Sequence, residues 1–163
     1  HFLFGLAFDQ IDVVIHPRSF VHSFVEFSDG VVKAELGSPD MKKPIQYAMT
    51  APERMAGLAP RFNPIGIDLT FWEPDRKRFP ALDMGYAAGR QGGNAPAVLN
   101  GADETAVAAF LARRIGFHEI TEVVADALDV VPTAPIPTLA SALAADAAGR
   151  VAAEESIASR SAR

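Results

Sequence analysis

The chain has 163 residues, enough for one ordinary domain or two small ones. Hydrophobic residues make up 49% of it, so it can build a core, and this excludes an intrinsically disordered protein. The net charge of −5 argues against a nucleic-acid surface, and the absence of cysteine excludes disulfides, thiolate metal sites and a thiol nucleophile. No stretch approaches the ~20 apolar residues of a membrane span.

The first half of the chain carries strand-like patterns. Residues 11–15 form a short, mostly apolar run, which predicts a buried strand. Alternating patterns in residues 20–27 and 31–36 flank Asp29-Gly30, a pair that tolerates a tight turn, so we predict an antiparallel hairpin.

A helix and an extended arm follow the hairpin. Pro44 is placed for the first turn of a helix that ends before Pro52, with Ile45, Ala48 and Met49 as its inner stripe. Proline residues then punctuate an extended arm over residues 59–80, in which residues 65–71 alternate as one short strand.

The second half, residues 81–163, is rich in alanine and shows helical spacing. We predict a small bundle from four signals. The first helix covers residues 81–90 and is closed by Gly92-Gly93. The second has Asn94 as its N-cap and an apolar stripe over 99–111. A clear third helix covers 117–131, and a loop follows over 132–137. Thr138 caps a short helix, and a long final helix begins at Asp146 and frays after Ser159.

Few residues point to chemistry by themselves. The four histidines lie at 1, 16, 22 and 118, with no pair at ligand spacing, so we assign neither a metal site nor a catalytic residue. Residues 89–93 are glycine-rich but follow a helix, which favours a helix stop over a nucleotide loop. Two residues keep two interpretations each. His22 is either functional or a partly buried structural histidine, and Met41 is either functional or a methionine that fills a gap in the core.

Four segments in one continuous register resemble the 1-deoxy-D-xylulose 5-phosphate reductoisomerase family. They are residues 15–23 (IHPRSFVHS), residues 36–45 (LGSPDMKKPI), the arm that contains 69–71 (LTF) and 78–82 (RFPAL), and residues 99–111 (LNGADETAVAAFL). Arg18 stands where the family usually has glutamine, and Gly101 where it has alanine. Ala51 stands where an aromatic residue often precedes the proline. Glycine in a helix costs roughly 1 kcal/mol relative to alanine, so we expect Gly101 to weaken its helix.

The resemblance implies an α+β chain: the remainder of a central α/β catalytic domain with an antiparallel hairpin, then an extended arm and a small α-helical bundle. The expected segments are 1–58 (carboxy-terminal part of the central catalytic and dimerisation domain), 59–80 (linker arm) and 81–163 (helical bundle). The family is a homodimeric, cytoplasmic bacterial enzyme of non-mevalonate isoprenoid biosynthesis. It converts 1-deoxy-D-xylulose 5-phosphate to 2-C-methyl-D-erythritol 4-phosphate, using NADPH and Mg²⁺ or Mn²⁺.

The resemblance also places Met41, with His22 close by, near the nicotinamide end of the cofactor site. The family's metal carboxylates and principal cofactor-binding residues match nothing in this chain, which opens on His1. We therefore expect a carboxy-terminal piece of the enzyme that is inactive alone. The alternative is a stand-alone, non-catalytic assembly or binding module of the same ancestry. In neither case do we expect a nucleic acid or membrane partner.

Overall fold

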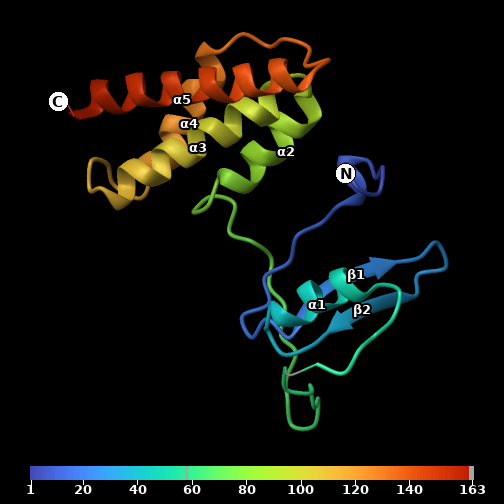
Figure 1. Cartoon of the computed structure of the whole chain (residues 1–163). Helices are drawn as coiled ribbons and strands as arrows, with labels where there is room; N and C mark the ends of the chain where they lie inside the picture. Colours follow the sequence, from blue (N-terminus) through green and yellow to red (C-terminus); the bar gives the residue numbers. More distant parts are fainter. Residues whose placement is uncertain (58, 162–163) are drawn as a thin grey trace. The chain divides into compact units, whose positions relative to one another are not determined.

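The computed structural model describes residues 1–57 and 59–161 and shows an α+β chain, as predicted. It divides into two compact units, Asp12–Pro74 and His1–Ile11 together with Asp75–Arg163. Residues 59–74 of the expected arm thus belong to the same unit as the hairpin, and residues 1–11 belong with the helices. Figure 1 shows the hairpin and first helix in blue to cyan and the later helices in green to red.

The smaller unit contains the predicted hairpin. Strand β1 (Val21–Glu26) pairs antiparallel with β2 (Val32–Leu36), which confirms the prediction. Gly30 takes a φ of +81°, a conformation that glycine adopts without steric cost, and its N–H donates to the carbonyl of Phe27 over 2.9 Å. The Asp29 carboxylate accepts the N–H of Val31 over 3.0 Å and fixes the exit of the turn.

The prediction of strands over residues 11–15 and 65–71 is wrong. Ile15 and Trp72 form one isolated antiparallel bridge, with N–H···O distances of 2.8 and 2.9 Å, and neither segment has a continuous partner. Val13, Val14 and Ile15 are exposed rather than buried. An alternating or apolar pattern reports what a side chain prefers, whereas a strand also needs a neighbouring backbone along its length.

Helix α1 (Lys42–Thr50) confirms the helix predicted around Pro44. The Asp40 carboxylate accepts the N–H of Lys42 over 2.9 Å, which satisfies a backbone donor at the start of the helix. The predicted inner stripe is wrong, because Ile45 is 53% exposed and Met49 is 83% exposed. The periodicity identified the helix correctly, but no described element of this unit covers that face.

The larger unit is the predicted helical bundle. It contains α2 (Ala81–Gln91), α3 (Ala95–Leu111), α4 (Glu119–Val130) and α5 (Leu139–Ser161), with the 3-10 turn η1 (Phe8–Gln10) against α2. Gly92 takes a φ of +68° directly after α2, which confirms the helix stop. None of the helices within the described residues is long and apolar enough to span a lipid bilayer.

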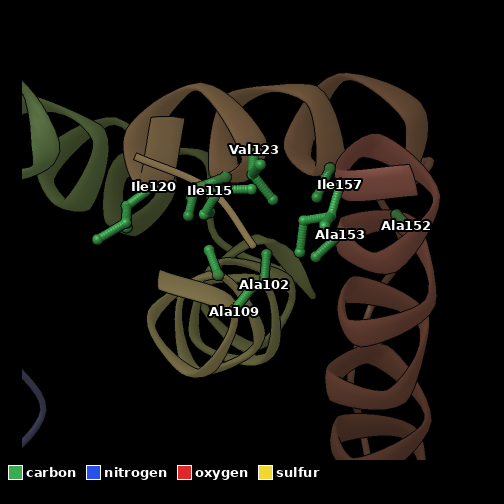
Figure 2. Close-up of a cluster of buried hydrophobic side chains, with 11 residues drawn as sticks. Ala102, Ala109, Ile115, Ile120, Val123, Ala152, Ala153 and Ile157 are labelled. Carbon is green, nitrogen blue, oxygen red and sulfur yellow. The ribbon is translucent and has the colours of Figure 1, made fainter. Parts of the chain in front are cut away.

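The bundle core lies between α3, α4 and α5, which contact one another in all three pairs. Figure 2 shows labelled core side chains from the three helices, together with Ile115 from the segment between α3 and α4. Small residues fill the α3 and α5 sides, and β-branched residues fill the space that they leave. The fully buried members with the largest side chains are Val98, Val123 and Ile157.

The final helix differs from the prediction. Residues 139–161 form one helix, where a short helix and a separate long helix from Asp146 were expected. Thr138 does cap its start, since its hydroxyl accepts the N–H of Ser141 over 3.2 Å. The sequence around Asp146 is rich in alanine and contains no proline, so the helix continues through it. The fraying predicted after Ser159 falls in part on residues 162–163, which lie outside the described residues.

Candidate functional site

The described part of the chain offers no protein site for a metal ion. It contains no group of three or more His, Cys, Asp or Glu side chains close enough to share one. His16 instead donates from Nδ1 to the carbonyl of Thr70 over 2.8 Å and stacks on the Phe71 ring at 4.7 Å. The residues present therefore do not fit the divalent ion that the family implies.

His22 and Met41 line the same pocket, which is open and has a volume of about 540 Å³. His22 comes from β1, and Met41 lies immediately before α1. Both side chains are exposed, and Met41 is 71% exposed. The interpretation of Met41 as a core gap-filler is thus wrong for this unit, since a residue that fills the core is covered by its neighbours.

The loop after β2 brings the residues of this pocket together. Gly37 is buried, and its N–H donates to the carbonyl of Phe20 over 2.9 Å. A Cβ on Gly37 would lie 3.4 Å from Lys43 Nζ and 3.7 Å from His22 Nε2. These are ordinary van der Waals distances, so the backbone of residue 37 lies close to both polar groups.

Lys43 anchors this loop to the segment after α1. Its ammonium donates to the Ser38 hydroxyl over 2.7 Å, and that hydroxyl donates to the carbonyl of Pro60 over 3.0 Å. No sequence pattern singles out Lys43, because its pairing depends on a contact with residue 60 that nothing local encodes.

Ser19 is a second pocket residue that the sequence did not reveal. It has a φ of +51°, which is uncommon outside glycine, and it lines the pocket beside His22. Strained backbone of this kind concentrates at functional sites. A serine in the sequence gives no sign of such a φ, so only the structure shows it.

The lining of this pocket can pack against a flat, weakly polar ring. The described residues supply no further site for a whole dinucleotide. Met41 offers a thioether to the lining, and His22 offers an imidazole. The glycine-rich residues 89–93 close α2 and do not open a helix after a strand, so they form no pyrophosphate loop. The described residues thus give this pocket a thioether and an imidazole, and they supply no pyrophosphate loop.

Comparisons with known proteins agree with the motifs. Residues 36–152 match the family profile described as DXP reductoisomerase C-terminal domain. The 1-deoxy-D-xylulose 5-phosphate reductoisomerase of Anaeromyxobacter dehalogenans is 50% identical over 97% of this chain and 41% of its own length. The enzyme of Cupriavidus necator is 45% identical over 100% of this chain and 42% of its own length.

Solved structures give the same result. The Zymomonas mobilis reductoisomerase in complex with NADPH superposes with a TM-score of 0.90 at 37% identity, over 95% of this chain and 41% of that one. A reductoisomerase in complex with NADPH, fosmidomycin and magnesium gives a TM-score of 0.82 at 36% identity, over 88% and 38%. The chain spans about two fifths of the length of the proteins it matches. It belongs to the 1-deoxy-D-xylulose 5-phosphate reductoisomerase family, whose carboxy-terminal domain it matches over residues 36–152.

Proposed function

We propose that this chain supplies the carboxy-terminal part of an NADPH-dependent reductoisomerase of the bacterial cytoplasm. The enzyme would convert 1-deoxy-D-xylulose 5-phosphate to 2-C-methyl-D-erythritol 4-phosphate for isoprenoid biosynthesis. The 50% identity over 97% of the chain carries this proposal. The bacterial sources of the relatives support it, as does the 0.90 TM-score against a reductoisomerase bound to NADPH.

Within such an enzyme, the pocket beside His22 and Met41 would receive the nicotinamide end of the cofactor. NADPH supplies a hydride when bound. Met41 would pack its thioether against the ring, a contact worth about 0.3–1.5 kcal/mol, which is enough to orient the ring but not to bind the cofactor. Lys43 and Ser38 hold the loop that carries Met41, so its position is fixed before the ring arrives.

The chain alone would be inactive. Its described residues present no cluster of metal ligands, and the pocket beside His22 and Met41 would receive one end of the cofactor only. The Lewis acid and the grip on the rest of NADPH would come from other parts of the enzyme.

We also propose that the enzyme is a homodimer whose subunits meet through the sheet. The sheet of the smaller unit has two strands, and Phe24, Val25 and Val32 are about half exposed on it. Two strands rarely form a stable sheet by themselves, and open apolar edges favour pairing with further strands.

A segment exchange tests the proposal. Residues 1–163 replace the corresponding region of the Cupriavidus necator relative, which aligns with the whole of this chain. NADPH oxidation is then measured with 1-deoxy-D-xylulose 5-phosphate and Mg²⁺. Turnover by the folded hybrid supports the reductoisomerase role, whereas a folded and inactive hybrid favours a non-catalytic assembly or binding module.

A further inference from the structure

We propose that the smaller unit carries a second binding site, for the phosphate group of a small phosphorylated molecule, in the pocket between α1 and residues 54–57 and 59–62. The pocket has a volume of about 570 Å³. It is distinct from the Met41 pocket, with which it shares Leu36 and Lys43. Ligand pockets in proteins measure roughly 300–1,000 Å³, so a small molecule fits.

Charge is distributed unevenly around this pocket. Residues 12–74 contain six Lys or Arg and eight Asp or Glu, so the unit as a whole is slightly acidic. Three of the six cations, Lys43, Arg54 and Arg61, line the pocket, and no acidic residue is among its described lining. The ion pairs of the described chain involve none of these three. Three cations gathered without a counter-charge favour a multiply charged anion between them.

The cations are held in position. The Arg54 guanidinium lies 4.4 Å from the centre of the Tyr47 ring, a cation–π contact that orients it before any ligand arrives. The Lys43 ammonium is anchored on the Ser38 hydroxyl at 2.7 Å. Arg61 belongs to the segment that Ser38 fixes through the carbonyl of Pro60.

The loop that carries Arg54 is tied down on α1. The Gln46 amide donates to the carbonyls of Met55 and Ala56, both over 3.2 Å. A Cβ on Gly57 would lie 2.6 Å from the Gln46 Oε1, so a larger residue at position 57 would displace the end of the Gln46 side chain that makes these hydrogen bonds. The wall is therefore built by specific contacts, and less ordering free energy is lost when an anion binds.

The ligand class follows from the donors. Two guanidinium groups and one ammonium suit a phosphate, which accepts several charge-assisted hydrogen bonds at once. Gln46, Tyr47 and Thr50 line the α1 side of the pocket, where the organic part of the molecule would lie. This inference depends only on the smaller unit and not on the proposed reductase activity.

Isothermal titration calorimetry of the 163-residue chain with inorganic phosphate and pyrophosphate tests the site. We expect saturable binding, tighter for pyrophosphate and weakened by salt because Arg54 and Arg61 are exposed. Arg54→Gln and Arg61→Gln should each weaken binding roughly tenfold, the effect of one charge-assisted hydrogen bond. Circular dichroism checks that each variant is folded.

Arg18→Gln is the matched control. Arg18 belongs to the same unit and lies 5.6 Å from the Phe20 ring centre, but it does not line the pocket. Arg18→Gln removes the same charge as Arg54→Gln does. The affinity of this control variant for pyrophosphate should nevertheless stay within about twofold of that of the unmodified chain. Absent binding would overturn the proposal. Non-saturable binding, or an equal loss of affinity in Arg18→Gln and Arg54→Gln, would show that general surface charge attracts the anion, and this would overturn the proposal too.

Discussion

A Cβ on Gly101 would lie 2.3 Å from the backbone carbonyl oxygen of Asp146. The contact has a counterpart, because a Cβ on Gly149 would lie 2.4 Å from the carbonyl oxygen of Val98. Each of the two helices α3 and α5 thus places a buried glycine against the backbone of the other. An alanine at position 101 does not fit this crossing.

The first prediction concerns this crossing. Gly101→Ala should destabilise the chain by about 1–3 kcal/mol, the range for forcing an extra methyl group into a packed core. Helix propensity alone predicts the opposite sign, a gain of roughly 1 kcal/mol. Urea unfolding measures the difference. Gly85→Ala is the control, since a Cβ on Gly85 of α2 would meet no atom within 4 Å, and this variant should stabilise.

The second prediction concerns Asn94, which precedes α3 as expected of an N-cap but does not cap it. Its amide donates to the Pro132 carbonyl and accepts the Ala134 N–H, both over 2.9 Å, and it is only 6% exposed. Asn94→Ala should cost about 1–3 kcal/mol, because two backbone groups of the loop lose their partner.

Asn94→Ser separates this role from capping. Serine is as good an N-cap as asparagine, but its single hydroxyl is too short to replace both loop contacts. We expect thermal unfolding of the serine and alanine variants at similar temperatures. A serine variant as stable as the unmodified chain would show that Asn94 acts as a helix cap after all.

The third prediction concerns pH. Hydrogen bonds from the Ser156 hydroxyl and then from Arg160 lower the pKa of Asp126 below its ordinary value of 3.8. The ionised carboxylate therefore stabilises the fold above pH 3.8, and this stability is lost as the pH falls through the lowered pKa. Ser156→Ala should raise that pKa, which a ¹³C NMR titration measures.

The same variant has a consequence for unfolding. Ser156→Ala should lower the free energy of unfolding at pH 7 by at most about 1 kcal/mol, because the Asp126 side chain is half exposed and screened. The difference should shrink towards pH 2. Ser159→Ala is the control, since its hydroxyl donates only to the Ser156 carbonyl of the same helix. A difference that persists unchanged at pH 2 would contradict the assignment.

The sequence predicted most elements because their signals are local. The hairpin follows from alternation around Asp29-Gly30, and the helices follow from apolar spacing and their terminal residues. The predictions failed where an outcome depends on a distant partner. Among the described residues, no strand pairs with the alternating residues 65–71, and none covers the apolar helix face that carries Ile45.

The candidate site was predictable only through the family motifs. His22 and Met41 are 19 positions apart, and their meeting in one pocket depends on the path of the Gly37 loop. The φ of Ser19 and the Lys43–Ser38–Pro60 chain leave no trace in a local pattern, because both arise from tertiary contacts.

The fourth prediction concerns Met41 in the reductoisomerase hybrid. Met41→Ala should weaken NADPH binding about tenfold, equivalent to ~1.4 kcal/mol. Thermal stability should hardly change, because the side chain is 71% exposed. Met49→Ala is the control, since Met49 is 83% exposed on α1 but does not line the pocket. A sharp fall in melting temperature with unchanged cofactor affinity would instead make Met41 a packing residue.

The steady-state kcat/KM of the hybrid tests the central claim most directly. The hybrid joins residues 1–163 of this chain to the remaining residues of the Cupriavidus necator relative, and the relative lacking this region is the control. If this chain supplies the carboxy-terminal part of a reductoisomerase, kcat/KM for metal-dependent NADPH oxidation should lie within about tenfold of the intact relative, while the shortened control is inactive. A hybrid that folds and binds NADPH, yet turns over no 1-deoxy-D-xylulose 5-phosphate, would contradict the claim.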